Sequence, residues 1–504
     1  MELSEQEVIR RQSLDSLRTM GIEPYPAALY PTNNFSIDIK SNFKDDEKPV
    51  DVCIAGRIMS RRIMGKASFI ELQDSKGRIQ VYISRDDINT EEQPEMYNTV
   101  FKKLLDIGDF IGVKGFVFRT QMGEISVHCK ELTVLSKSLR PLPIVKYKDG
   151  VAYDSFDDAE MRYRQRYVDL VVNEGVKDIF LKRSRVYKSM REYFNSFDYV
   201  EVETPILQPI PGGASARPFI THHNALNREY YLRIATELPL KKLIVGGFDK
   251  VFELGRIFRN EGMDATHNPE FTTMEAYSAF ESLDDMMTLS EQLYQHIAKS
   301  LNKTTIEYKG VTIDFTKPFN RISMIDCIKN ACGVDFNNIK TNEEAIALAK
   351  EHNITLEKHE QTLGHVISKF FEEYGEATCM QPTFVYDHPI EISPLAKKCQ
   401  NNKNITRRFE LFICGKEYAN AFSELNDPID QYERFEEQLK ERELGNSEAN
   451  DMDMDFIEAL EYGLPPTGGV GYGIDRLCML FTNKETIRDV LLFPHMKDET
   501  NNNE

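Results

Sequence analysis

The stretch VFELGRIFRNEGMDATHNPEFTTMEAYSAF, residues 251–280, limits the possible folds more than any other part of the chain. Two runs of alternating apolar residues flank a polar segment that contains Gly262 and Asn268-Pro269. Such alternation is typical of half-buried strands, and glycine with Asn-Pro is typical of a loop. The pattern predicts an antiparallel hairpin with a long loop, around which the rest of the chain is built.

The two predicted strands carry an unusual set of polar side chains. Alternation places Arg259 and Glu261 on one face of the first strand, and Phe271, Glu275 and Tyr277 on one face of the second. Charged groups are rarely buried unless they are paired or bind a ligand. A solvent-exposed ion pair explains any single arginine and glutamate, but the whole set indicates a ligand-binding face.

A second polar hairpin is predicted in TRRFELFICGKEYANAFSELNDP, residues 406–428. Glu410 and Glu417 lie on opposite arms of a turn at Gly415-Lys416, close enough to share a magnesium ion, which prefers carboxylate and phosphate oxygen. Strict alternation would place Glu417 on the face opposite Asn420, so we expect a bulge between these two residues.

Two glycine-bearing segments are candidate ligand loops. In GLPPTGGVGYGIDRLCMLFT, residues 463–482, glycines precede a predicted helix, and Arg476 lies near the helix N-terminus, where anions are favoured. In QPIPGGASARPF, residues 208–219, small residues permit close approach of the backbone to a ligand, but a plain turn explains them equally well. A glycine-rich loop alone is a weak indication of phosphate binding.

Five short alternating strands are predicted between residues 50 and 140. They suit a small closed barrel such as an OB-fold, which recurrently binds single-stranded nucleic acid, although a purely structural barrel fits the pattern equally well. The formal net charge of −19 opposes nucleic-acid binding, but residues 52–80 carry six basic and two acidic residues, a balance of 6 − 2 = +4. Any nucleic acid is expected to dock there.

The composition, with 41% hydrophobic and 28% charged residues, is that of an ordinary soluble globular protein. No apolar run has membrane-spanning length, the N-terminus is charged, and the eight cysteines include no Cys-x-x-Cys pair. We therefore expect a cytoplasmic protein with reduced cysteines and no membrane partner. The expected domains are a helix and barrel at 1–145 and a second domain at 146–504, with a mainly helical insertion at about 282–375.

The order Arg259-x-Glu261, a loop, Phe271 and Glu275 resembles the second signature motif of the class II aminoacyl-tRNA synthetases. RNEGMDATHNPEFTTMEAY is similar to the lysine-specific, bacterial-type members of subclass IIb. GRIMSRRIMGKASFIELQDSKGRIQVY resembles their anticodon-binding barrel, and the glycine-rich segment before Arg476 resembles their third signature. The resemblance covers almost the whole chain and implies an α+β fold: a five-stranded OB-fold barrel, then a catalytic antiparallel sheet flanked by helices.

The resemblance implies an enzyme that activates L-lysine with ATP to lysyl-adenylate and transfers lysine to the 3′ end of tRNA(Lys). The nearer alternative is a subclass IIb synthetase for aspartate or asparagine, which Glu237, Glu275 and Glu424 disfavour because a carboxylate substrate needs a basic partner. The farther alternative is a non-catalytic RNA-binding paralogue, or a ligase that attaches lysine to a protein.

The resemblance also implies roles for individual residues. The residues expected to bind ATP are Arg259, Glu261, His267, Asn268, Phe271, Glu410 and Arg476. Arg259 and Arg476 are the expected catalytic residues, because they offset charge on the phosphates. The residues expected to bind lysine are Gly213, Glu237, Glu275, Tyr277, Asn420, Phe422 and Glu424. The residues expected to bind the anticodon are Arg61, Phe69 and Gln80, and those expected to hold Mg²⁺ are Glu410 and Glu417.

Two further expectations come from the resemblance. Glu424 matches the family residue that contacts the substrate ε-amine, and its neighbours in SELNDP include no basic residue, so we expect its carboxylate to be available to lysine. The helix and strand ending in YVEVETPIL resemble the first signature, which implies a homodimer. Asp198 stands there where the family usually has glycine, which predicts a slightly different turn.

Overall fold

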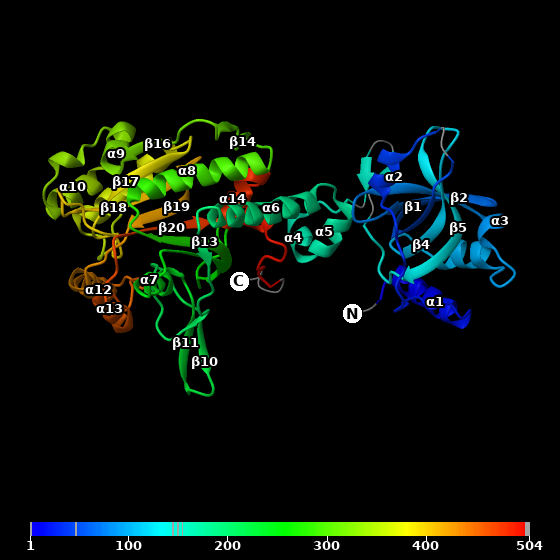
Figure 1. Cartoon of the computed structure of the whole chain (residues 1–504), viewed down its shortest axis with the longest axis horizontal. Helices are drawn as coiled ribbons and strands as arrows, with labels where there is room; N and C mark the ends of the chain where they lie inside the picture. The colour runs from blue at the N-terminus through cyan, green and yellow to red at the C-terminus, as the bar shows by residue number, and fades with distance from the viewer. Residues whose placement is uncertain (1–2, 46–47, 144–145, 149–150, 154, 499–504) are drawn as a thin grey trace. The chain divides into compact units, whose positions relative to one another are not determined.

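Two separately packed units, Met1–Asp157 and Asp158–Glu504, make up the chain in the computed structural model (Figure 1). The structure describes residues 3–45, 48–143, 146–148, 151–153 and 155–498. The domain boundary expected at residue 145 lies outside the described residues. Each unit has its own hydrophobic core.

The first unit contains a closed barrel of five strands. These are β1 (Asp51–Met64), β2 (Ala67–Gln73), β3 (Arg78–Ser84), β4 (Phe110–Arg119) and β5 (Ile125–Ser136), paired in the order β1-β2-β3-β5-β4. The other elements are α1 (Glu5–Thr19), α2 (Ser36–Asn42), α3 (Arg85–Ile88), the π-helix η1 (Met96–Leu104), and the short strands β6 (Lys146–Lys148) and β7 (Val151–Tyr153). Every second residue of β2 and β3 is buried, because alternate side chains fill the barrel. The predicted barrel is confirmed.

An eight-stranded sheet forms the centre of the second unit. Its strands are β8 (Val200–Glu201), β12 (Lys250–Phe258), β13 (Glu270–Ala279), β16 (Asn320–Ser323), β17 (Thr383–Pro389), β18 (Ile405–Ile413), β19 (Lys416–Ser423) and β20 (Thr467–Gly473). They follow the order β16-β17-β18-β19-β20-β13-β12-β8, with parallel pairs at the two edges and antiparallel pairs between. The predicted α+β class is confirmed, and the hairpin predicted at 251–280 is formed by β12 and β13.

Helices cover both faces of this sheet (Figure 1). On one face, α6 (Val176–Asn195), α8 (Leu283–Ser300) and α14 (Ile474–Thr482) share a core with Met274 and Ala276 of β13. On the other face, α7 (Glu237–Val245), α12 (Pro428–Glu443) and α13 (Met454–Glu461) share a core with Tyr277. Because side chains alternate along β13, Thr273 and Glu275 lie on the same face as Tyr277.

The segment 282–375 contains α8 and a helical cluster that has its own core. The cluster is built from α9 (Met324–Cys332), η2 (Phe336–Asn338), α10 (Asn342–Glu351), α11 (Leu363–Phe370) and η3 (Phe371–Gly375), and η4 (Glu376–Thr378) follows it. The same segment includes a hairpin of β14 (Thr305–Tyr308) and β15 (Val311–Asp314). Within the described ranges, no helix combines the length and apolar character needed to cross a membrane.

Short elements connect these parts of the second unit. They are α4 (Ala159–Arg164), α5 (Arg166–Val172), α15 (Ile487–Val490) and a three-stranded sheet of β9 (Leu207–Gln208), β10 (Ile220–His223) and β11 (Arg228–Leu232). Asp198, in the turn between α6 and β8, has a φ of 61°. This is the left-handed conformation that glycine adopts most easily and that aspartate tolerates, so Asp198 can replace the usual glycine there.

Candidate active site

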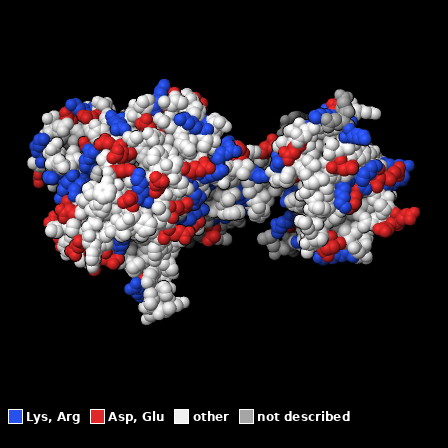
Figure 2. Space-filling model, viewed as in Figure 1, with Lys and Arg blue, Asp and Glu red and all other residues white. Residues whose placement is uncertain are grey.

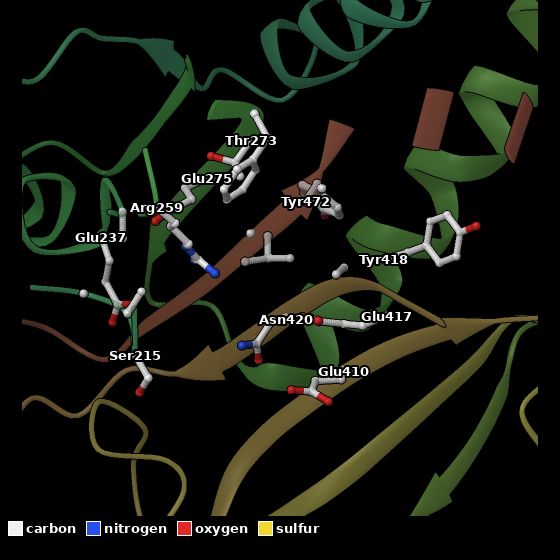
Figure 3. A pocket seen from close by; sticks show the side chains of 18 of the residues that line it. Ser215, Glu237, Arg259, Thr273, Glu275, Glu410, Glu417, Tyr418, Asn420 and Tyr472 are labelled. Atoms are coloured by element: carbon white, nitrogen blue, oxygen red, sulfur yellow. The ribbon is translucent and has the colours of Figure 1, made fainter. Parts of the chain in front are cut away.

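A cavity of about 450 Å³ lies against β13, β18, β19 and β20 of the second unit (Figure 3). It brings together all the residues expected to bind ATP, lysine or metal, while their individual roles stay predictions. They are Gly213, Glu237, Arg259, Glu261, His267, Asn268, Phe271, Glu275, Tyr277, Glu410, Glu417, Asn420, Phe422, Glu424 and Arg476.

Arg259 points into the cavity (Figure 3), but it does so from a loop. Regular pairing of the hairpin ends at Phe258↔Glu270, so the expectation that Arg259 and Glu261 share a strand face is wrong. The guanidinium carbon of Arg259 lies 5.2 Å from the centre of the Phe271 ring, and its buried Nε has no hydrogen-bond partner among the described residues. Burial lowers the pKa of Arg259. A half-buried arginine with a buried, unused Nε donor suits an anionic ligand.

The loop between β12 and β13 is fixed by its own side chains. Asp264 accepts a hydrogen bond from the His267 backbone N–H at 2.8 Å, and its other oxygen lies 2.7 Å from His267 Nδ1. The buried Asn268 donates to the Glu270 carbonyl at 2.6 Å and accepts from the His495 N–H at 3.3 Å. Both ends of the Asn268 amide are therefore engaged within the protein, whereas the His267 side chain is exposed.

Glu424 lies just past the end of β19 and is only 2% exposed. The expectation that it has no basic partner is wrong, because Lys241 Nζ forms a buried ion pair with it. The same Nζ lies 2.5 Å from Glu237 Oε1. Lys241 belongs to α7, where its i,i+4 spacing from Glu237 places both on one helix face. Burial raises the pKa of Glu237 and of Glu424, and the Lys241 ammonium opposes both shifts.

Glu275 and Tyr277 complete this acidic end of the cavity. Glu275 accepts hydrogen bonds from the Thr236 backbone N–H at 3.1 Å and from the Tyr277 hydroxyl at 3.0 Å. Gly469 of β20 lies against them, and a Cβ there would be 2.1 Å from Glu424 Oε1 and 2.5 Å from the Tyr277 ring. Such distances are far below van der Waals contact, so only glycine leaves room for these two side chains.

A bulge in β19 turns Glu417 toward the cavity. Leu411 of β18 pairs with Ala419, but the next residue, Phe412, pairs with Glu417, which leaves Tyr418 as the extra residue. The Tyr418 side chain packs into the core, and Figure 3 shows it pointing away from the other labelled side chains. The bulge predicted between Glu417 and Asn420 is therefore confirmed, and it lets both residues line one cavity.

Glu410 and Glu417 lie side by side in the cavity (Figure 3). Burial and the neighbouring Glu410 carboxylate raise the pKa of Glu417, because two adjacent negative charges repel. This donor set fits a hard divalent cation, which relieves that repulsion. Among the described residues, no group of three or more His, Cys, Asp or Glu side chains has the arrangement of a metal site. Water and phosphate oxygens would supply the remaining ligands of the cation.

Arg408 is a cavity residue that the sequence reasoning missed. It donates from Nε to Asn420 Oδ1 at 3.1 Å and from a terminal nitrogen to Glu410 Oε1 at 2.6 Å, and another bond to the Ile392 carbonyl anchors it. Its position two residues before Glu410 on a strand is a signal that alternation could have supplied. Because Arg408 occupies the Asn420 oxygen, the amide nitrogen of Asn420 is the end left for a ligand.

Arg476 lies in the first turn of α14, beside Glu417. One terminal nitrogen donates to the Glu417 carbonyl at 2.8 Å and lies 3.4 Å from the Glu417 carboxylate. The preceding Asp475, also missed by the sequence reasoning, accepts from the Thr272 backbone N–H at 2.7 Å and pairs with Arg183 at 2.5 Å. Asp475 therefore fastens the start of α14 to β13 and α6, which fixes the position of Arg476.

A row of aromatic rings crosses the barrel of the first unit on β2, β3, β5 and β4. Ring centres are 5.2 Å apart between Phe69 and Tyr82, 4.9 Å between Tyr82 and His128, and 4.8 Å between His128 and Phe116. Gln80 shares this face, because it lies two residues before Tyr82 on β3. Of the ring residues only Phe69 was expected. The row offers the π surfaces on which unpaired bases stack.

Arg61, which was expected to bind the anticodon with Phe69 and Gln80, does not lie beside this aromatic row. It pairs across the sheet with the core residue Ile70, and its guanidinium donates to carbonyls at the end of η1, including that of Lys102 at 2.7 Å. A bulge earlier in β1 reverses the alternation. Arg62 instead lies opposite Phe69, with its guanidinium carbon 5.3 Å from the centre of the ring.

Comparison with known proteins gives both units a family. Residues 158–497 match the model of the class II tRNA synthetases (D, K and N), and residues 52–135 match that of the OB-fold nucleic acid binding domain. A lysine–tRNA ligase of Porphyromonas gingivalis is 59% identical, over 99% of this chain and 86% of that protein. Lysine–tRNA ligases of Azobacteroides pseudotrichonymphae and Malacoplasma penetrans are 54% and 52% identical, over 99% of this chain and of each protein. The chain therefore belongs to the class II tRNA synthetases of the D, K and N type, with an N-terminal OB-fold domain.

Proposed function

We propose that the protein is a lysine–tRNA ligase, which joins L-lysine to tRNA(Lys) with conversion of ATP to AMP and diphosphate. The observation that carries the proposal is one cavity with an acidic end and a basic wall. The acidic end holds Glu237, Glu275 and Glu424, and the basic wall holds Arg259 and Arg476. Lysine brings two ammonium groups and one carboxylate, and ATP brings phosphates, so each substrate meets groups of opposite charge.

The lysine site is built from residues already fixed by the fold. Glu237 accepts the α-ammonium beside Gly213, and Glu424 with Tyr277 accepts the ε-ammonium. Arg259 and the amide nitrogen of Asn420 bind the carboxylate. This assignment is supported by the Arg408 bond that orients the Asn420 amide. Glu275 holds the Tyr277 hydroxyl and so supports the same site. Phe422, under the Arg408 guanidinium, packs against the aliphatic stem.

Activation requires no side chain as nucleophile. A carboxylate oxygen of lysine attacks the α-phosphorus of ATP, the bond to the β-phosphate breaks, and diphosphate leaves. Arg259 bridges the lysine carboxylate and the α-phosphate, while Arg476 binds the γ-phosphate, so charge that builds on the phosphates is offset. Phe271 stacks on adenine, and Glu261, His267 and Asn268 belong to the loop beside the nucleotide. In the second step a terminal ribose hydroxyl of tRNA attacks the lysyl carbonyl and AMP leaves.

Mg²⁺ is the proposed cofactor, with Glu410 and Glu417 as its protein ligands. The bound ion would neutralise phosphate charge. Glu410→Gln and Glu417→Gln are each expected to raise the Mg²⁺ concentration needed for half-maximal activation, because each removes one charged oxygen ligand. Titration of Mg²⁺ in lysine-dependent ATP–pyrophosphate exchange measures this requirement. Glu373→Gln, which alters an exposed carboxylate of η3, is the control. Coincident titrations for all proteins would make Glu410 and Glu417 structural residues.

The barrel is proposed to bind the anticodon of tRNA(Lys) through Phe69, Gln80 and Arg62, with Arg62 taking the place first expected for Arg61. Phe69→Ala is expected to weaken tRNA charging by about 1–3 kcal/mol, the contribution of stacking on one base, and to leave lysine activation intact. Aminoacylation and ATP–pyrophosphate exchange measured on the same preparation separate the two effects. Phe35→Ala, which removes an exposed ring outside the aromatic row, is the control. Equal losses in both assays would refute the proposed role of the barrel.

A homodimer in the cytoplasm is the proposed state of the enzyme. Support comes from exposed apolar side chains around β8–β10, which monomers rarely leave in contact with water. They include Val200 (46% exposed), Leu207 (46%) and Ile220 (60%). The projecting β10–β11 hairpin also shows few charged side chains (Figure 2). Sedimentation equilibrium tests this proposal, and a monomer at micromolar concentration would contradict it.

The experiment that tests the function is ATP–pyrophosphate exchange with each standard amino acid in turn. Lysine is expected to support exchange and the others to support little, because a pocket built around charged hydrogen bonds rejects ligands that leave them unpaired. Activation of aspartate or asparagine would identify another enzyme of the same family. The absence of exchange with any amino acid would indicate a protein that binds RNA without activating an amino acid.

A further inference from the structure

The helix α7 supplies a buried charged residue, behind two carboxylates that line the cavity, to which the proposed mechanism gives no task. Lys241 is fully buried, with a side chain that is 0% exposed. Its Nζ contacts Glu237 at 2.5 Å and pairs with Glu424, the two residues proposed to receive the α- and ε-ammonium groups of lysine. The Phe456 ring of α13, with its centre 5.8 Å from Nζ, closes the other side.

Burying the Lys241 ammonium between two carboxylates costs desolvation free energy, so its presence indicates a functional role. Removing an ammonium from water costs several kcal/mol, and apolar residues in place of the whole ion-paired group would fill the space at least as stably. Lys241 therefore contributes something that an apolar residue cannot, namely a fixed positive charge. That charge acts on both carboxylates at once, because one nitrogen atom contacts both.

The charge balance of the site shows what Lys241 provides. When ionised, Glu237, Glu275 and Glu424 carry three negative charges, and Lys241 reduces the total to two, since 3 − 1 = 2. Lysine carries two ammonium groups, which neutralise these two charges, while its carboxylate is left for Arg259. Without Lys241 the buried site would hold one carboxylate more than the substrate can neutralise, and it would take up a proton instead.

We propose that Lys241 is a specificity-determining positioning residue, whose ammonium holds Glu237 and Glu424 in place and matches the charge of the site to lysine. It does not contact the reacting atoms and acts through the two carboxylates. The proposal rests on the lysine–tRNA ligase function proposed above. It adds a residue from α7 to the recognition of lysine.

The charged and titratable groups around Lys241 determine how its loss depends on pH. They are Glu237 on its own helix, Glu275 and Tyr277 on β13, Glu424 after β19 and Arg408 on β18. Burial raises the pKa of Glu237 and Glu424, and Lys241 lowers it. A carboxylate binds an ammonium in its ionised form, so affinity is gained as pH rises through the raised pKa. Without Lys241 the pKa of both carboxylates is higher, so the increase in affinity for lysine occurs at a higher pH.

Lys241→Met is the test, because methionine fills a similar volume without the charge. The lysine KM in ATP–pyrophosphate exchange is expected to rise at least about tenfold near neutral pH, as expected when a buried charge loses its partner. The ratio of variant to wild-type KM should be largest at low pH and should fall as pH rises, with the KM for ATP unchanged. The same ratio at every pH would mean that Lys241 only supports the fold, and would overturn the proposal.

Lys242→Met is the matched control. Lys242 is the next residue of α7, but its side chain is 30% exposed and pairs with Asp455 at the surface, so its loss should leave the lysine KM and its pH profile unchanged. A pH-dependent change in this control as large as that in Lys241→Met would also overturn the proposal.

A double variant makes the test independent of stability. In Glu424→Gln protein one of the two carboxylates that Lys241 balances is already neutral, so adding Lys241→Met should change the lysine KM by a smaller factor than it does in the wild type. If Lys241→Met fails to fold, this double variant should fold, because it leaves one buried carboxylate, that of Glu237, without its partner instead of two. The proposal would be overturned if Lys241→Met raised the lysine KM by the same factor in the wild type and in Glu424→Gln. Failure of both Lys241→Met and the double variant to fold would also overturn it.

The assays distinguish failure of this inference from failure of the proposed function. If the wild-type protein does not activate lysine, the lysine–tRNA ligase function is wrong. If the wild type activates lysine and Lys241→Met has the same lysine KM and the same discrimination against uncharged lysine analogues, only the role of Lys241 is wrong.

Discussion

Replacing Arg259 with glutamine is expected to lower the rate of lysine-dependent ATP–pyrophosphate exchange by about 10²–10³-fold. The guanidinium lines the cavity, lies over Phe271, and keeps its buried Nε donor unpaired among the described residues. It is the cavity cation proposed to touch both reacting groups, the lysine carboxylate and the α-phosphate. Glutamine retains donors but loses the charge, so the loss should fall mainly on kcat, because charge on the phosphates grows in the transition state.

Arg256→Gln is the control for this change. Arg256 lies on β12, three residues before Arg259, but its side chain is 44% exposed, and the carboxylate of Glu270 is 4.0 Å away. Its replacement should leave exchange within about twofold of the wild type, since an exposed ion pair of this kind contributes little. Steady-state kinetics of both variants measure the difference. An Arg259→Gln enzyme with normal kcat would exclude Arg259 from the activation step.

Glu424→Gln is expected to weaken lysine binding by about 3–5 kcal/mol, which raises the lysine KM roughly 10²–10⁴-fold, because it leaves the ε-ammonium without its charged partner. The KM for ATP should change little, since Glu424 lies at the acidic end of the cavity and Arg476 at the other. Discrimination against uncharged analogues such as norleucine should shrink as well, because the variant no longer offers a charge that they leave unpaired.

The pH dependence of the lysine KM supplies a second measurement for Glu424. Burial raises the pKa of this carboxylate, so in the wild type the lysine KM should fall as pH rises through that raised value. The amide of Glu424→Gln cannot ionise, so the variant should lose that part of the pH dependence. Glu433→Gln, an exposed position on α12, is the control. A Glu424→Gln enzyme with an unchanged lysine KM would remove Glu424 from the lysine site and reopen the choice of amino acid.

Local patterns predicted much of this fold and cavity from the sequence. Apolar alternation gave the β12–β13 hairpin and the five barrel strands, because each signal is contained within a single strand or turn. The bulge before Asn420 was predictable for the same reason: strict alternation put Glu417 on the face opposite Asn420, although both residues were expected to bind ligands. The family resemblance then indicated which residues gather around the cavity, although their individual roles still await the experiments above.

Two departures show what local patterns could not reveal. Arg61 was expected to bind the anticodon with Phe69 and Gln80, but a bulge earlier in β1 reverses the alternation, and no residue in that stretch marks the bulge. Arg62 therefore takes its place beside Phe69. The partner of Glu424 was missed because Lys241 comes from a helix distant in sequence. Its i,i+4 relation to Glu237 was visible, but contact with a third carboxylate depends on tertiary packing.

The bulge at Tyr418 changes which residues of β19 face the cavity: an odd-numbered residue faces it before the bulge, and even-numbered residues face it after the bulge. On either side of it alternation is regular, yet the odd-numbered Glu417 and the even-numbered Asn420 reach the same cavity. One short strand thus contributes to both proposed sites. Glu417, before the bulge, lies at the proposed cation site, and Asn420, after the bulge, lies at the proposed lysine site. If β19 were straightened with Tyr418 retained, alternation would be regular along its whole length, and either Glu417 or Asn420 would turn away from the cavity. The bulge in this strand, as much as its composition, is therefore under functional constraint.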